Sequence, residues 1–162
     1  MESLQSLLES YLADRPHQHA LAVGALACQL VGQSPQLQDS TTWQKIARFS
    51  DLTELEPDLR YDAAIVSDIF EQLPHESVRA LIARLRDVQT AALMLVVNAE
   101  HAERYWSEQE FLSLGLANRG LYRFQDKTYR VYTFDINSYK QTPDWLNPNN
   151  WAHPERWEKH RW

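Results

Sequence analysis

Apolar residues in the first half of the chain recur at spacings that predict short helices and strands. Leucines at every third or fourth position predict an amphipathic helix over residues 3–13. Residues 19–24 are mostly apolar and end in glycine, which is typical of a buried strand, and residues 25–31 predict the start of a helix. Polar residues then dominate, and only residues 43–49 indicate one further short strand.

The apolar pattern becomes clearer after residue 58. Residues 61–68 form an apolar segment with an aspartate near each end, and residues 91–97 are nearly all aliphatic. Between them, apolar residues over 78–88 recur at helical spacing, with arginines outside the stripe. A strand, a helix and a second strand with a crossover of this length predict a βαβ unit, in which the strands are parallel and the connection is right-handed.

The end of the patterned region predicts a helix and a hairpin. Ser107 and Glu110 have the spacing of a capping box, which predicts a helix over residues 108–114. Gly115 suits a left-handed residue at the end of that helix. Two segments then alternate apolar and polar residues around a polar turn, which predicts an antiparallel hairpin. These segments are residues 121–124 and 129–136.

Length and composition agree with a single domain and single out two residue types. A chain of 162 residues and 19.0 kDa can bury one core of ordinary size. We therefore expect one α/β domain over residues 1–137, with parallel strands, a C-terminal antiparallel hairpin and helices on both faces of the sheet. The chain has 4 glycines, where average usage gives about eleven, which argues against a glycine-rich phosphate loop. It has 6 tryptophans, four of them after residue 140.

Net charge and cysteine content limit the classes of binding partner and the cellular compartment that we expect for this protein. A net charge of −6 argues against a nucleic-acid partner, because binding to a duplex depends on neutralising its phosphates. The single cysteine, Cys28, cannot form an intrachain disulfide and lies in an apolar run, so we interpret it as a packing thiol in a reducing compartment. No segment has the roughly 18 to 20 apolar residues of a membrane span. We expect a cytoplasmic protein without membrane or nucleic-acid partners.

Residues 61–74, with the sequence YDAAIVSDIFEQLP, resemble the fourth-strand motif of the class I S-adenosylmethionine-dependent methyltransferases. In that family an aromatic-Asp pair opens an apolar strand, which leads to a short acidic loop that ends in Leu-Pro. The predicted elements that follow, down to the final hairpin, have the family's order, so the resemblance covers roughly the second half of the chain. It implies a Rossmann-like sheet and makes S-adenosylmethionine the candidate cofactor.

The first half departs from the family's pattern at the cofactor loop. The cofactor-binding strand of the family ends in an acid followed by several spaced glycines, because the backbone must approach the methionine portion of the ligand without a Cβ between them. Residues 21–28 have the sequence LAVGALAC, so only Gly24 remains and the acid is missing. Fewer than about forty residues separate this strand from Asp62, too few for two further strands and two helices of usual length. We therefore expect a reduced sheet, with one βα unit shortened or missing.

The resemblance assigns three candidate cofactor-binding residues, Gly24, Asp51 and Asp68. Asp51 takes the adenine-side position after the third strand, and Asp68 lies at the carboxyl end of a strand, where ligands bind in open α/β sheets. Each aspartate also has a structural interpretation, because Asp51 can cap a turn and Asp68 can cap the loop to Pro74. We assign no catalytic residue and no metal site. His101 is the histidine nearest to a strand end, although a solvated loop is its simpler interpretation.

Residues 138–162, here called the strap, combine prolines with regularly spaced tryptophans. Proline interrupts regular ladders, so we expect successive turns that present the indoles. Because indoles exposed to water are unfavourable, they should cover either this protein's own sheet and helices or a partner protein. Tryptophan and arginine commonly anchor interfaces. The candidate partner-binding residues are Trp145, Trp151, Arg156, Trp157 and Trp162.

Three hypotheses for function follow from these features. The preferred one is a methyltransferase-like domain that has lost its cofactor loop and serves as a binding or regulatory module rather than as an enzyme. The second is a small active methyltransferase that uses S-adenosylmethionine and an unidentified acceptor, and that catalyses mainly by orienting this acceptor. The third is a protein-interaction scaffold that acts through the strap.

Overall fold

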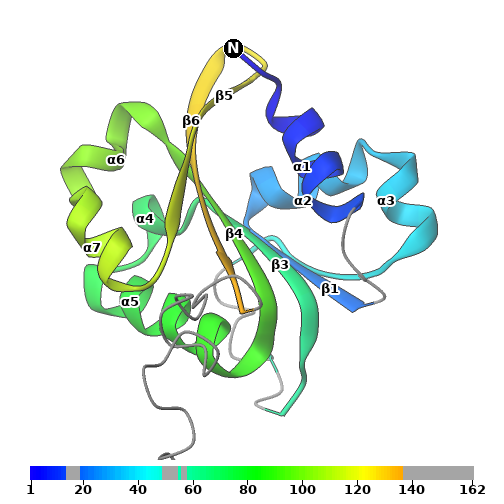
Figure 1. Cartoon of the computed structure of the whole chain (residues 1–162), viewed down its shortest axis with the longest axis horizontal. Helices are drawn as coiled ribbons and strands as arrows, with labels where there is room; N and C mark the ends of the chain where they lie inside the picture. The colour runs from blue at the N-terminus through cyan, green and yellow to red at the C-terminus, as the bar shows by residue number, and fades with distance from the viewer. Residues whose placement is uncertain (14–18, 49–54, 56–57, 137–162) are drawn as a thin grey trace, which may run out of the picture.

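The computed structural model describes residues 1–13, 19–48, 55 and 58–136 (Figure 1). Asp51 and the whole strap lie outside these residues. The described part forms a six-stranded sheet in the order β2-β1-β3-β4-β6-β5. Its strands are β1 (His19–Val23), β2 (Thr42–Ile46), β3 (Tyr61–Ser67), β4 (Thr90–Asn98), β5 (Ala117–Phe124) and β6 (Lys127–Asp135).

The sheet is parallel on one side and antiparallel on the other. β1 pairs in parallel with both β2 and β3, and β3 pairs in parallel with β4. β6 then runs antiparallel to β4, and β5 runs antiparallel to β6. The predicted βαβ unit and the predicted hairpin are thus confirmed. Because β1 to β4 run in the same direction, their carboxyl ends lie at one edge of the sheet, which is where open α/β sheets bind ligands.

The central strands are buried because helices cover both of their faces. In β3, Ala64, Ile65 and Val66 are fully buried, although they alternate between the two faces. In β4, the side chains of Leu93, Met94 and Leu95 are also fully buried. Parallel strands covered on both faces are expected to be aliphatic throughout rather than alternating with polar residues. This explains why these two segments gave the clearest pattern in the sequence.

The helices form one layer on each side of the sheet, as Figure 1 shows. The first layer contains α1 (Leu4–Ala13), α2 (Ala25–Gly32) and α3 (Pro35–Ser40). The second contains α4 (Ile69–Gln72), α5 (His75–Arg84), α6 (Ala99–Tyr105) and α7 (Glu108–Ser113). Each layer has its own hydrophobic cluster against the sheet. The prediction of helices on both faces is confirmed.

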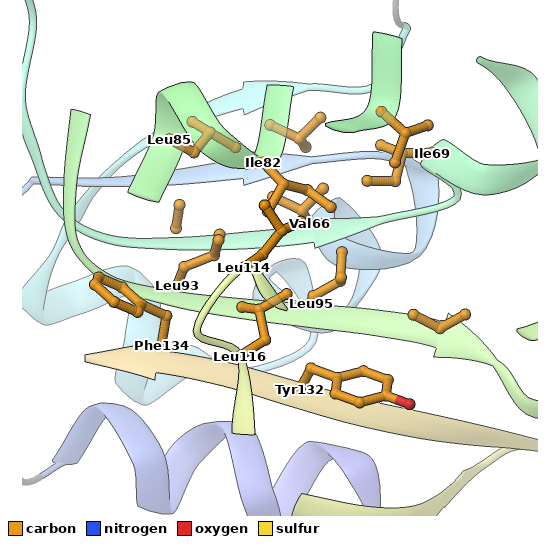
Figure 2. Close-up of a cluster of buried hydrophobic side chains, with 14 of the residues drawn as sticks. Val66, Ile69, Ile82, Leu85, Leu93, Leu95, Leu114, Leu116, Tyr132 and Phe134 are labelled. Carbon is orange, nitrogen blue, oxygen red and sulfur yellow. The ribbon is translucent and has the colours of Figure 1, made fainter. Parts of the chain in front are cut away.

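The cluster on the α4–α7 side combines aliphatic and aromatic packing (Figure 2). Ile82 of α5 and Leu85 pack over Leu93 of β4, and all three side chains are fully buried. Phe111 of α7 stacks on Tyr132 of β6 with ring centroids 3.9 Å apart. These contacts attach the second helical layer to both the parallel and the antiparallel part of the sheet.

Three sequence predictions need correction. Three helices, α3, α4 and α6, were not predicted, because each has at most seven residues. Residues 69–72, expected as part of a loop that leads to Pro74, form α4. α6 also places His101 in a helix rather than in a solvated loop. The predicted stripe over residues 78–88 does not stay on one buried face, because α5 continues into a π-helical turn, Leu85–Gln89. The wider turn rotates Val88 off the stripe and leaves it 50% exposed.

The first half of the sheet is reduced, as predicted. Between β1 and β3 the described residues contain a single strand, β2, which is five residues long and lies at the edge of the sheet. The amino ends of β1 and β3 are joined by the Asp62 carboxylate, which accepts a hydrogen bond of 3.0 Å from the backbone N–H of His19. None of the described helices is long and apolar enough to cross a membrane.

Candidate functional site

The candidate site lies where the carboxyl ends of β1, β3 and β4 meet the beginnings of α2, α4 and α6. Each of these strands leads directly into the helix that follows it, with Gly24, Asp68 and Asn98 at the junctions. Short strand-to-helix turns at this edge bring backbone N–H groups and polar side chains together. Two of these junction residues, Gly24 and Asp68, are sequence-predicted site residues.

Gly24 has a backbone conformation that only glycine adopts readily. Its φ of 100° and ψ of 156° lie in a region that is almost exclusive to glycine. A Cβ on Gly24 would lie 2.3 Å from the carbonyl oxygen of Ser67 and 2.5 Å from its Oγ. The Gly24 N–H donates to the carbonyl of Ile46 at 2.8 Å. Gly24 therefore lets the turn after β1 pass directly against the end of β3.

The first turn of α2 is capped by the last side chain of β3, Ser67, and by the next one, Asp68. The Asp68 carboxylate accepts a hydrogen bond of 3.0 Å from the N–H of Leu26. The Ser67 hydroxyl accepts one of 2.9 Å from the N–H of Ala27 and donates one of 2.8 Å to the Asp68 carboxylate. Helix N-termini leave such N–H groups without intrahelical partners. Because Gly24 has no side chain to cap them, Ser67 and Asp68 supply the acceptors from the neighbouring strand.

Asp68 makes these contacts from a left-handed backbone conformation, with a φ of 61° and a ψ of 7°. Such a conformation is uncommon outside glycine, although aspartate tolerates it better than most residues. Asp68 directly precedes α4 but makes no side-chain capping hydrogen bond to that helix. The structural interpretation therefore changes in one respect: the Asp68 carboxylate caps α2 rather than the loop that leads to Pro74.

A small polar cavity of about 60 Å³ lies beside Asp68, at the carboxyl ends of β3 and β4. Apolar side chains of α4 and β4 form part of its wall. The polar residues that line it are Asp68, Glu71, Asn98, His101, Lys127 and Tyr129. Burial raises the pKa of the Tyr129 hydroxyl, and the nearby negative charges of Asp68 and Glu71 raise it further. Tyr129 is therefore a neutral phenol at physiological pH.

Of the remaining candidate residues, Cys28 is packed in a way that suits a structural role, and the others lie outside the described residues. Burial raises the pKa of the Cys28 thiol, and the thiol donates a 3.8 Å hydrogen bond to the carbonyl of Ala22. This arrangement agrees with a packing role. In the described ranges, no three His, Cys, Asp or Glu side chains are grouped so that they could hold a metal ion. Outside those ranges lie Asp51, Trp145, Trp151, Arg156, Trp157 and Trp162.

The structure brings Gly24 and Asp68 together through a residue that sequence reasoning missed. Ser67 contacts both of them, and it is fully buried at the end of β3. A serine followed by an aspartate at the end of a buried strand was a visible signal, but their partners lie some forty residues earlier in the chain. Tyr129 and Asn98 were missed because they come from the hairpin and from β4, whose patterns indicate only strands.

Comparison with solved structures confirms the resemblance at the level of the fold. Magnesium protoporphyrin IX methyltransferase from Synechocystis PCC 6803, solved with bound S-adenosylmethionine, is 16% identical with a TM-score of 0.50 over 80% of this chain and 77% of its own. The PH0226 protein from Pyrococcus horikoshii OT3 is 11% identical, with a TM-score of 0.50 over 80% of this chain and 87% of its own. The shared fold is that of the class I S-adenosylmethionine-dependent methyltransferases.

Comparison at the level of sequence identifies a family but no match among curated proteins. A search among curated proteins finds no match. A family model does match, and it covers residues 2–162, which is nearly the entire chain. The described part of this protein has a reduced class I methyltransferase fold. The chain itself belongs to DUF6231, a family of unknown function.

Proposed function

We propose that this protein is a methyltransferase-like module that does not hold S-adenosylmethionine at the usual site of its fold and that acts by binding or regulation rather than by catalysis. The supporting observation is the pair of hydrogen bonds from the first turn of α2 to Ser67 and Asp68. The first turn of α2 follows β1, which corresponds to the cofactor-binding strand of the class I methyltransferases. In this chain the N–H groups of Leu26 and Ala27 already donate hydrogen bonds to the protein's own side chains.

The capping by Asp68 opposes a ligand in two ways. A helix N-terminus attracts anions because of its unpaired N–H groups and its dipole. With the Asp68 carboxylate already there, the carboxylate of the cofactor's methionine portion would meet a like charge. The ligand would also have to displace caps that each contribute about 0.5–2 kcal/mol to the free energy of unfolding. On the side of Gly24 that faces Ser67, a ligand could not approach the backbone, because Ser67 fills that space.

The cavity that described residues form beside Asp68 is also small. The cavity beside Asp68 has a volume of about 60 Å³. Pockets for cofactors and other small molecules usually start at about 300 Å³, roughly five times as much. The described residues that line this cavity do not fit a ligand as large as S-adenosylmethionine.

A ligand titration of the full-length protein tests the proposal. We expect S-adenosylmethionine and S-adenosylhomocysteine, at about 1 mM each, to leave the melting temperature unchanged. A site with a Kd near 10 µM would instead stabilise the folded state by about 2.7 kcal/mol at that concentration, which raises the melting temperature by several degrees. Isothermal calorimetry that detects micromolar binding would overturn the proposal and favour the active methyltransferase.

The variant Asp68→Ala separates the two hypotheses further. If Asp68 holds a cofactor, its loss should abolish binding and leave the melting temperature of the apo protein unchanged. If it caps α2, its loss should lower the melting temperature by the equivalent of about 1 kcal/mol, with no binding before or after the change. Asp39→Ala is the control, because Asp39 is an exposed aspartate on α3.

A further inference from the structure

The edge of the sheet opposite the candidate site carries a second hollow, here called the amino-edge groove. It has a volume of about 250 Å³ and lies at the amino ends of β3 and β4. Asp62 of β3, Ala91 of β4 and the residues Asp87, Val88 and Ile136 are among those that line it. The groove is therefore separate from the cavity beside Asp68, which lies at the carboxyl ends of the same strands.

Two exposed apolar side chains form part of the otherwise largely polar wall of the amino-edge groove. Among the described residues, Val88 and Ile136 are two of the few large apolar side chains that remain exposed, at 50% and 60%. Both line the groove. The π-helical turn before β4 directs Val88 outward, and Ile136 extends the β6–β4 ladder by donating its N–H to the carbonyl of Ala91 at 3.0 Å. Neighbouring apolar side chains exposed together are typical of a surface that another segment covers.

Chain connectivity argues for the strap as the segment that covers it. Ile136 is the last described residue, so the chain continues towards the strap directly from the wall of the groove. Trp145 follows nine positions later, and a stretch of that length spans at most about 30 Å. A segment tethered so closely has an effective concentration in the millimolar range, about a thousandfold above a micromolar partner.

The chemistry of the groove suits an indole. Tryptophan combines a large apolar ring with an N–H donor that needs an acceptor when buried. The groove offers the apolar surface of Val88 and Ile136 together with the carboxylates of Asp62 and Asp87. Arg86 holds the pKa of Asp87 below its usual range, mainly through its hydrogen bonds of 2.6 and 3.0 Å, so this carboxylate is ionised at neutral pH. The groove volume also suits one large side chain rather than a cofactor.

We propose that the amino-edge groove is the docking site of this protein's own strap, with Trp145 as the side chain that fills it. This assignment is independent of whether the candidate site binds a cofactor. It gives the first tryptophan of the strap an intramolecular role and leaves the later ones, Trp151, Trp157 and Trp162, as the candidates for a partner protein.

Limited proteolysis of the full-length protein tests this assignment. Chymotrypsin cleavage after Trp145, identified by mass spectrometry, should be slow when the indole is docked. Val88→Lys places a charge in the groove at a half-exposed position, and we expect it to accelerate this cleavage about tenfold, equivalent to about 1.4 kcal/mol of lost protection. The matched control is Leu112→Lys on α7, because Leu112 is 54% exposed and does not line the groove.

Two further measurements keep the test decisive. Ile136→Lys should reproduce the effect of Val88→Lys, and circular dichroism should show that both variants keep the wild-type fold. Equal cleavage rates in the wild type, Val88→Lys and Leu112→Lys would overturn the assignment. Protection that depends on protein concentration would also overturn it, because the groove would then hold a segment of a second copy rather than the strap of the same chain.

Discussion

At the scale of single residues, Gly24 shows how one position can determine the geometry of the whole site. Its positive φ and the 2.3 Å distance that a Cβ would have to the Ser67 carbonyl oxygen are separate constraints. The positive φ restricts the backbone of Gly24 itself, whereas the close approach restricts the distance between the end of β1 and the end of β3. The resemblance marks Gly24 as a candidate contact for a cofactor, and the structure adds a second requirement for glycine, the close approach of Ser67.

Substituting the glycines measures these two constraints. Gly24→Ala combines an unfavourable φ with a backbone clash, and we expect it to lower the free energy of unfolding by about 3 kcal/mol or more. Gly120→Ala is the matched control, because Gly120 has a similar φ of 104° but a Cβ added to it would meet nothing within 4 Å. It should cost about 1–2 kcal/mol. Chemical denaturation of both variants gives the values, and equal losses would show that the contact with Ser67 is unimportant.

Ser67 provides a second prediction at this scale. Its hydroxyl is fully buried and takes part in hydrogen bonds with Ala27 and Asp68. Ser67→Ala should lower the free energy of unfolding by about 1–3 kcal/mol, because it leaves the buried Ala27 N–H without its acceptor. Ser113→Ala removes an exposed hydroxyl that donates to the carbonyl of Glu110 at 2.7 Å, and it should change stability little. Urea denaturation of the two variants and the wild type compares them.

The sequence revealed candidate positions at this site but not their partners. Asp68 stood out because it ends an apolar strand within a recognisable motif. That its carboxylate reaches the N–H of Leu26 depends on β1 and β3 lying side by side, with Val23 opposite Val66. No local pattern contains this pairing. The function of Asp68 as a cap on another helix could therefore be found only from the tertiary structure.

At the scale of elements, prediction succeeded where burial or local pairing leaves a clear pattern in the sequence and failed where neither does. β3 and β4 were recognised because two covered faces demand unbroken aliphatic residues. α3 contains a single buried residue, Leu37, and so leaves little helical pattern in the sequence. Val88 was misplaced because a π-helical turn changes the period within one helix. The capping box of α7 was predicted correctly, because its two side chains pair locally.

The same capping box predicts an acid-dependent contribution to stability. The N–H of Ser107 donates to the Glu110 carboxylate, and this hydrogen bond, followed in importance by the one to His75, lowers the pKa of Glu110. A carboxyl whose pKa is lower in the folded state stabilises the fold above its usual pKa. This contribution is lost as the pH falls through the folded-state value.

Glu110→Gln should therefore lower the melting temperature near pH 7, and the difference from the wild type should shrink as the pH approaches about 3. Glu108→Gln is the matched control, because it removes a charge from the same first turn but lies outside the capping box. Thermal unfolding of the three proteins across this pH range provides the measurement. A difference that stays constant down to about pH 3 would contradict the assigned hydrogen bond.

At the scale of the whole molecule, α1 joins the parallel half of the sheet to the hairpin. Gln5 donates to the carbonyl of Leu30 in α2 at 3.1 Å, and the Tyr11 hydroxyl donates to the carbonyl of Phe134 in β6 at 3.4 Å. The carbonyl of Glu2, just before the helix, accepts a hydrogen bond of 3.0 Å from the N–H of Arg123 in β5. α1 thus completes the first helical layer across a sheet whose other edge is reduced.

Because α1 connects both halves, its loss should affect the entire domain rather than one end. Leu8 is fully buried in the cluster that α1 forms with α2 and the sheet. Leu8→Ala should lower the free energy of unfolding by about 2–5 kcal/mol through lost burial and the resulting cavity, while unfolding remains a single cooperative transition. Leu112→Ala is the control, since Leu112 is 54% exposed. Two separate transitions by fluorescence and circular dichroism would show instead that α1 belongs to a subdomain that unfolds independently.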